Sequence, residues 1–244
     1  MAMHVSRTKI AINGIALLVL IFSGIYFTTL RPSDSSYEST SSNLDILKEN
    51  STVIARTFNT DAPPYFNSTE ELDAFLNAVA SYQKITTDLS ESAVMQRGIS
   101  SKREYAIAKD QLAIYGQSVK NTAEAVLVYY NILENCGYIR TYTPTELTDR
   151  SNNICLQTFA AAEAAPNSGF KSQFLTPYAE YVSSMVKIVG GSTKNKEAEL
   201  DKQRRNIELL YRDTVIDYGL APSPAKQIDK LREVVNQEKT SFIR

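Results

Sequence analysis

The most apolar part of the chain is residues 10–30, IAINGIALLVLIFSGIYFTTL, which carry no charge and lie between Arg7 and Lys9 on one side and Arg31 on the other. As a helix, these 21 residues would span about 30 Å, the thickness of the hydrocarbon core of a bilayer. The pattern predicts a transmembrane helix. No later stretch is apolar enough for a second crossing.

A retained anchor is favoured over a cleaved signal peptide, because the apolar core of a secretory signal is usually only about 7 to 15 residues long. A cleaved signal stays open as the alternative. The basic residues Arg7 and Lys9 place the tail of residues 1–9 in the cytoplasm. The expected location is the inner (plasma) membrane, crossed once, with a periplasmic or other extracytoplasmic domain.

Residues 31–43 contain the serine-rich stretch RPSDSSYESTSS. With so few apolar side chains to bury, this segment is expected to be a flexible tether between the membrane and the domain.

From Leu44 onwards, apolar residues recur at intervals of three and four, as in helices that bury one face. The longest such pattern is Tyr105, Ala108, Leu112, Tyr115, Val119, Thr122, Val126, Tyr129, Leu133 and Cys136. Capping boxes at Ser68 with Glu71 and at Ser101 with Glu104 indicate helix starts. Strands are not expected, because no apolar-polar alternation is sustained.

The predicted fold is all-α: a single N-terminal transmembrane helix followed by an antiparallel bundle of six or seven helices over residues 44–219. Helices are expected at residues 44–58, 68–97, 102–136, 143–165, 176–191 and 194–218. Tyr178 and Tyr181 lie on the expected packing face of the helix at 176–191, as Tyr211 and Val215 do on that of the next helix.

A C-terminal helical arm, residues 220–244, follows Pro222-Ser223-Pro224. Its apolar stripe is predicted to bind a groove on a partner protein and comprises Ile228, Leu231, Val235 and Phe242. The alternative is that this helix packs on its own domain beside Leu200 and Ile207.

Cys136 and Cys155 are the two cysteines of the chain. An even count outside the cytoplasm favours a disulfide, which would join the end of the long helix to the next helix. In a reducing compartment the two residues would instead be buried thiols.

The only histidine is His4. The domain after the anchor therefore has no Ser-His-Asp or Cys-His catalytic system and no histidine-ligated metal. It also lacks a CxxC pair and a phosphate-binding loop. No catalytic residue, metal site or cofactor is predicted. A net charge of −1 argues against a nucleic-acid partner.

Two groups of side chains keep other chemistry open. Glycan cleavage needs one or two acids, and the candidates are Glu134, Asp149 and Glu163. Glu163 lies among alanines, and its more ordinary role is to face solvent from an alanine-rich helix. Nothing in the sequence pairs Glu134 with Asp149. An aromatic ligand groove could form around Tyr129, Tyr130, Tyr138 and Tyr142. Tyrosines at the edge of a core are the more ordinary interpretation.

The function expected from these features is that of a non-enzymatic scaffold or adaptor subunit in a cell-envelope assembly. Its partners would be other envelope proteins, and a homo-oligomer is possible. The alternatives are an immunity or inhibitor protein and a ligand-sensing bundle. A Glu-dependent cell-wall hydrolase is disfavoured.

We expect residues 10–30 to be retained, because their length matches the bilayer and their basic flank precedes them. N-terminal sequencing of the protein from a membrane fraction should find residues 1–30 present. A mature chain that begins after Leu30, or a C-terminal reporter that is active only in the cytoplasm, would contradict this.

Overall fold

The structure is a computed structural model that describes residues 31–60, 62–100, 102–136, 156–191 and 195–241. Every regular element in these ranges is helical, so the all-α prediction is confirmed for this part of the chain. The α-helices are α2 (Asp34–Thr57), α3 (Thr69–Glu91), α4 (Arg103–Cys136), α6 (Leu156–Ala164), α7 (Thr176–Gly190), α8 (Lys196–Asp213) and α9 (Ala225–Ser241). The π-helical turns η2 (Val94–Gly98) and η5 (Lys171–Leu175) precede α4 and α7.

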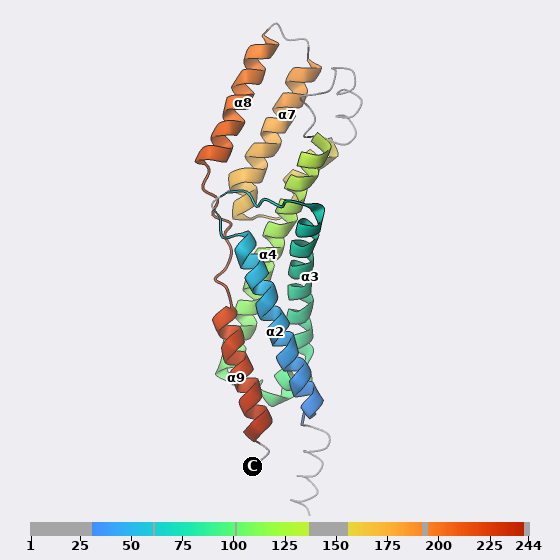
Figure 1. Cartoon of the computed structure of the whole chain (residues 1–244), viewed down its shortest axis with the longest axis vertical. Helices are drawn as coiled ribbons and strands as arrows, with labels where there is room; N and C mark the ends of the chain where they lie inside the picture. The colour runs from blue at the N-terminus through green and yellow to red at the C-terminus, as the bar shows by residue number, and fades with distance from the viewer. Residues whose placement is uncertain (1–30, 61, 101, 137–155, 192–194, 242–244) are drawn as a thin grey trace, which may run out of the picture.

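The helices form a long molecule with a bundle at one end and a helical hairpin at the other (Figure 1). In the lower bundle, α2 packs against α3 and α9, and both of these pack against α4. In the upper part, α7 pairs with α8, while α6 contacts α4 and α7. The first turn of α2 and the last turn of α9 both lie at the lower end, opposite the hairpin.

Helix α4 belongs to both parts of the molecule. Its 34 residues give it a length of about 50 Å. The predicted packing face is confirmed from Ala108 to Cys136, where its members are buried except for Leu133, which is partly buried, as Tyr105 is at the start of the helix. Residues three and four apart lie on the same face of a helix, so this one row of side chains contacts helices of both parts.

The flexible tether predicted for residues 31–43 is wrong from Asp34 onwards, because α2 begins there. The hydroxyl of Ser33 caps the helix by accepting the N–H of Ser36 at 3.2 Å. Tyr37 and Thr40 are each 2% exposed and face the core. They extend the spacing of three and four residues back from Leu44, and this spacing outweighs the serine-rich composition.

The capping box predicted at the start of α3 is present in a modified form. Ser68 accepts the N–H of Glu71 at 3.4 Å. The Glu71 carboxylate accepts the N–H of Asn67 at 2.7 Å, rather than that of Ser68 as in the usual box. The second box depends on Ser101, which lies outside the described residues.

The helix predicted to start at Thr176 begins earlier, at Gly169, and passes through η5 into α7. Thr176 donates its N–H to the carbonyl of Lys171, five residues back. The next residue, Pro177, has no N–H and its ring crowds the preceding turn. The wider π turn accommodates this proline within a continuous helix.

The helix predicted at residues 194–218 ends at Asp213, and an irregular segment continues to α9. Gly169 explains part of this path, because a Cβ atom on it would lie 1.7 Å from the carbonyl oxygen of Asp217. Its N–H donates to the carbonyl of Tyr218 at 3.3 Å. The chain then turns at Gly219, whose φ of +66° favours glycine.

The partner-binding stripe predicted on the C-terminal arm is wrong for its described members. Ile228, Leu231 and Val235 are each 1% exposed, because α9 packs into the lower bundle. Phe242 lies outside the described residues. The alternative, that this helix packs on its own domain, is confirmed. Its expected neighbours Leu200 and Ile207 are wrong, since they belong to α8 at the other end of the molecule (Figure 1).

Among the described residues, no helix has the length and apolar character needed to cross a membrane. Residues 1–30, with the predicted tail and anchor, lie outside this part of the chain, and the anchor stays a prediction.

The burial of α9 predicts that Leu231→Ala lowers the free energy of unfolding by about 2 to 5 kcal/mol, because it opens a cavity in the core. The control is Lys230→Ala at the adjacent exposed position, which should change this free energy by less than about 0.5 kcal/mol. Urea unfolding followed by circular dichroism measures both. A loss for Leu231→Ala no larger than that of the control would contradict the packing of α9.

Candidate functional site

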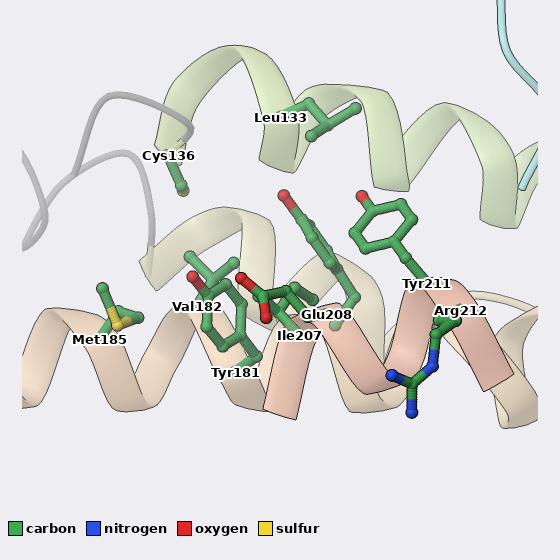
Figure 2. Close-up of a pocket in the computed structure, with 10 residues that line it drawn as sticks. Leu133, Cys136, Tyr181, Val182, Met185, Ile207, Glu208, Tyr211 and Arg212 are labelled. Carbon is green, nitrogen blue, oxygen red and sulfur yellow. The ribbon is translucent and has the colours of Figure 1, made fainter. Parts of the chain in front are cut away.

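A groove opens in the upper part of the molecule between the end of α4, α7 and α8 (Figure 2). Its volume is about 790 Å³. It is lined by Leu133 and Cys136 of α4, by Tyr178, Tyr181, Val182 and Met185 of α7, and by Ile207, Glu208, Tyr211 and Arg212 of α8.

Helical spacing places these side chains on facing surfaces. On α7, Tyr178, Val182 and Met185 are three and four residues apart and buried, so they form one stripe towards the groove. On α8 the buried residue is Ile207, and Tyr211 lies one turn further on. Helix α8 therefore covers one side of the groove without being enclosed by other helices.

The wall of the groove rests on a cluster of aromatic rings. Tyr129, one turn before Leu133 on α4, contacts Phe174 and Tyr178 edge to face, with ring centroids 5.3 and 5.0 Å away. Tyr211 contacts the same two rings at 5.2 and 6.4 Å. Edge-to-face contacts are favourable because the positive edge of one ring meets the negative face of another. The cluster gives the groove a fixed aromatic wall.

A hydrogen bond between two phenols joins α4 to α8. The hydroxyls of Tyr129 and Tyr211 are 2.7 Å apart. Burial raises the pKa of Tyr129 and of Tyr211, so both phenols stay neutral below a pH of about 10. The pair is therefore a structural contact at neutral pH and supplies no acid or base.

The charged side chains that line the groove are Glu208 and Arg212, one of each sign. Arg212 donates to both carboxylate oxygens of Asp213, at 2.6 and 3.0 Å, and these hydrogen bonds lower the pKa of Asp213. In Figure 2 the Arg212 guanidinium points away from α4, whereas Glu208 lines the same groove as Tyr181 and Val182. Glu208 forms no salt bridge with any residue in the described ranges.

The aromatic groove considered around Tyr129, Tyr130, Tyr138 and Tyr142 is not the groove that the structure contains. Tyr129 is 5% exposed and belongs to the aromatic cluster behind it. The Tyr130 hydroxyl is bound elsewhere, accepting the N–H of Phe66 and donating to the carbonyl of Pro64, each at 3.0 Å. Tyr138 and Tyr142 lie outside the described residues.

The tyrosines that do line the groove are Tyr178, Tyr181 and Tyr211, which the sequence assigned only to packing faces. The sequence does contain a signal that these tyrosines lie near one another. A short connection between two predicted helices implies antiparallel neighbours, which brings their aromatic stripes together. The pattern within either helix alone indicates only a packing face.

Cys136 lies at the end of α4 with 3% of its surface exposed, and the hydroxyl of Thr158 on α6 is 3.5 Å from its Sγ atom. The predicted disulfide needs Cys155, which lies outside the described residues, so the pairing stays a prediction.

The candidate carboxylates form no acidic site in the described residues. Glu134 and Glu163 are both exposed and lie on different helices, while Asp149 is outside the described residues. No group of three or more His, Cys, Asp or Glu side chains suited to a metal ion occurs in the described part of the chain. The groove between α4, α7 and α8 is therefore the candidate functional site.

We expect Tyr211→Phe to lower the free energy of unfolding by about 1 to 3 kcal/mol, because the buried Tyr129 hydroxyl loses its partner. The double variant Tyr129→Phe, Tyr211→Phe should recover most of this loss. Tyr65→Phe is the matched control, since Tyr65 is 81% exposed. Equal stabilities of Tyr211→Phe and the control in urea would contradict the hydrogen bond between the phenols.

Comparison with known proteins supplies no relative. No family model matches the chain, and neither the curated proteins nor the solved structures include a match. An all-α bundle supports many unrelated functions, so the function has to be inferred from the surface of this chain.

Proposed function

We propose that the protein is a membrane-anchored, extracytoplasmic helical adaptor that holds a protein-recognition surface away from the bilayer, as a subunit of a cell-envelope assembly. The observation that carries this proposal is that the start of α2 and the α7–α8 hairpin lie at opposite ends of the molecule. The first turn of α2, the helix that follows the predicted anchor in the sequence, lies at the lower end, and the α7–α8 hairpin lies at the upper end (Figure 1). Helix α4 alone separates the two ends by about 50 Å.

The outer side of the hairpin has the character of a docking surface. A shallow hollow of about 550 Å³ lies between α7 and α8 and is lined by Pro177, Tyr181, Leu209 and Leu210, among others. Leu209 is 45% exposed, and Val215, just beyond α8, is 70% exposed. By contrast, the apolar stripe of α9 is fully used within the lower bundle.

The partner proposed for this surface is a protein with an apolar face bordered by both signs of charge. Arg204, Arg205, Glu208 and Asp213 surround the exposed apolar residues of α8, and they carry both signs. Apolar contacts with a mixed polar rim, in which arginine is common, are typical of protein interfaces. The mixed charge gives no attraction for nucleic acid or for an anionic membrane surface.

The test is photo-crosslinking in intact cells. A photoreactive residue at position 209 or 215 should capture the same envelope protein from both positions. The matched control is position 107 near the start of α4, where Ile107 is 43% exposed at the opposite end of the molecule, and it should not capture that protein.

Three results would overturn the adaptor proposal. They are crosslinks no stronger at positions 209 and 215 than at 107, crosslinks only to a second copy of the chain, and crosslinks to a secreted toxin. The last would identify an immunity or inhibitor protein, which would use the same kind of surface.

A ligand-binding bundle is the second candidate, and the groove between α4, α7 and α8 favours it. A volume of about 790 Å³ lies within the range of small-molecule sites, about 300 to 1,000 Å³. The groove and the hollow that contains Leu209 share Tyr181 and Ile207 and differ in their other lining residues.

A further inference from the structure

We propose that the groove between α4, α7 and α8 binds a small organic cation, an ammonium group carrying alkyl or aryl substituents. This inference rests on the ligand-binding candidate above and names the chemical class of its ligand. It combines three properties of the groove: its aromatic wall, its one unpaired charge and its size.

The aromatic wall suits a cation. Tyr178 contacts Tyr181 and Tyr211, with ring centroids 6.2 and 6.4 Å away, and the Tyr178 and Tyr211 rings are inclined by 84°. Tyr178 is buried, so most of the accessible aromatic surface of the groove belongs to Tyr181 and Tyr211. A cation within about 6 Å of such rings is attracted by their negative faces, and quaternary ammonium groups are held in this way because they cannot donate hydrogen bonds.

The groove offers a ligand few hydrogen-bonding groups, and one tyrosine hydroxyl is already bound. The hydroxyl of Tyr211 is bound to that of Tyr129 at 2.7 Å. A ligand that needed many hydrogen bonds, such as a sugar, would find few partners on the apolar side chains of Leu133, Val182 and Met185. An alkylated ammonium needs apolar contact and a nearby negative charge.

Glu208 supplies that charge. It lines the groove together with Tyr181 and Val182 and has no salt-bridge partner in the described part of the chain. Arg212, the basic residue of the lining, is held by both oxygens of Asp213. Arg204, one turn before Glu208, is bound to Asp201 at 3.0 Å. Because Asp213 offsets the charge of Arg212, the Glu208 carboxylate is the lining charge that can attract a cationic ligand.

The size of the groove limits the ligand. A volume of about 790 Å³ holds a drug-sized molecule, and a helix of a partner protein is too large for it. The size of the groove therefore suits a small molecule.

Choline is a suitable probe, and 3,3-dimethylbutan-1-ol, its neutral isostere, tests the need for charge. The protein labelled with ¹³C-methyl methionine provides the readout. The chain has four methionines; Met185 lines the groove, while Met95 is fully buried in the lower bundle. Addition of the cation should shift the Met185 methyl signal and leave the Met95 signal unchanged.

Two matched pairs of variants test the named residues. Glu208→Gln should weaken binding of the probe by about fivefold or more. Glu199→Gln, which makes the same charge change on α8 away from the groove, should not weaken it. Tyr181→Leu keeps an apolar side chain but removes the ring, and it should also weaken binding, whereas Tyr65→Leu should have no effect.

The experiments can overturn the cation proposal without overturning the adaptor proposal. No shift of Met185 at millimolar probe overturns the proposal, as does equal binding of the neutral isostere or equal affinity of the Glu208→Gln and Glu199→Gln variants. The Met95 signal and circular dichroism confirm that each variant is folded. The adaptor proposal is tested separately by crosslinks at positions 209 and 215, so either idea can fail alone.

Discussion

The row of buried side chains along α4 is the contact on which the rest of the structure depends. Its lower members pack against α3 and α9, and its upper members pack against α6 and η5. Because a single helix carries both sets, the position of the hairpin relative to the lower bundle is fixed by the register of one rigid element. A break in this helix would separate the groove from the end where the predicted anchor joins.

A belt of aromatic side chains reinforces α4 at the junction of the two parts. Tyr218 lies in the irregular segment before α9, contacts Phe58 at the end of α2 with ring centroids 4.8 Å apart, and stacks on Phe170 at 6.0 Å. Its hydroxyl also donates to the carbonyl of Ala62. Segments that are distant in the sequence are therefore joined at one level of the molecule. Tyr129 continues the belt to the groove through its contact with Phe170 at 5.9 Å.

The two ends of the molecule differ in how fully their helices are enclosed. The lower bundle buries the apolar stripe of α9, although Ile107 and Ile114 of α4 are exposed. The hairpin is less enclosed, since α8 buries Ile207 but exposes Leu209 and part of Tyr211. Regions with few buried contacts open at low energetic cost, and such regions commonly bind ligands and partners. The small number of buried residues on α8 therefore supports the proposal that recognition takes place at the upper end.

The sequence alone determined the helical class and the packing face of α4, because a spacing of three and four residues has one structural solution along a helix. It also determined the cap at Ser68 and the buried positions of α9. It did not determine what covers each face. Whether Ile228, Leu231 and Val235 meet their own bundle or a partner depends on contacts with distant helices, as does the end of α8, where Gly169 meets Asp217. The groove likewise forms only when α4, α7 and α8 come together, so it was decided by tertiary packing and not by any local pattern.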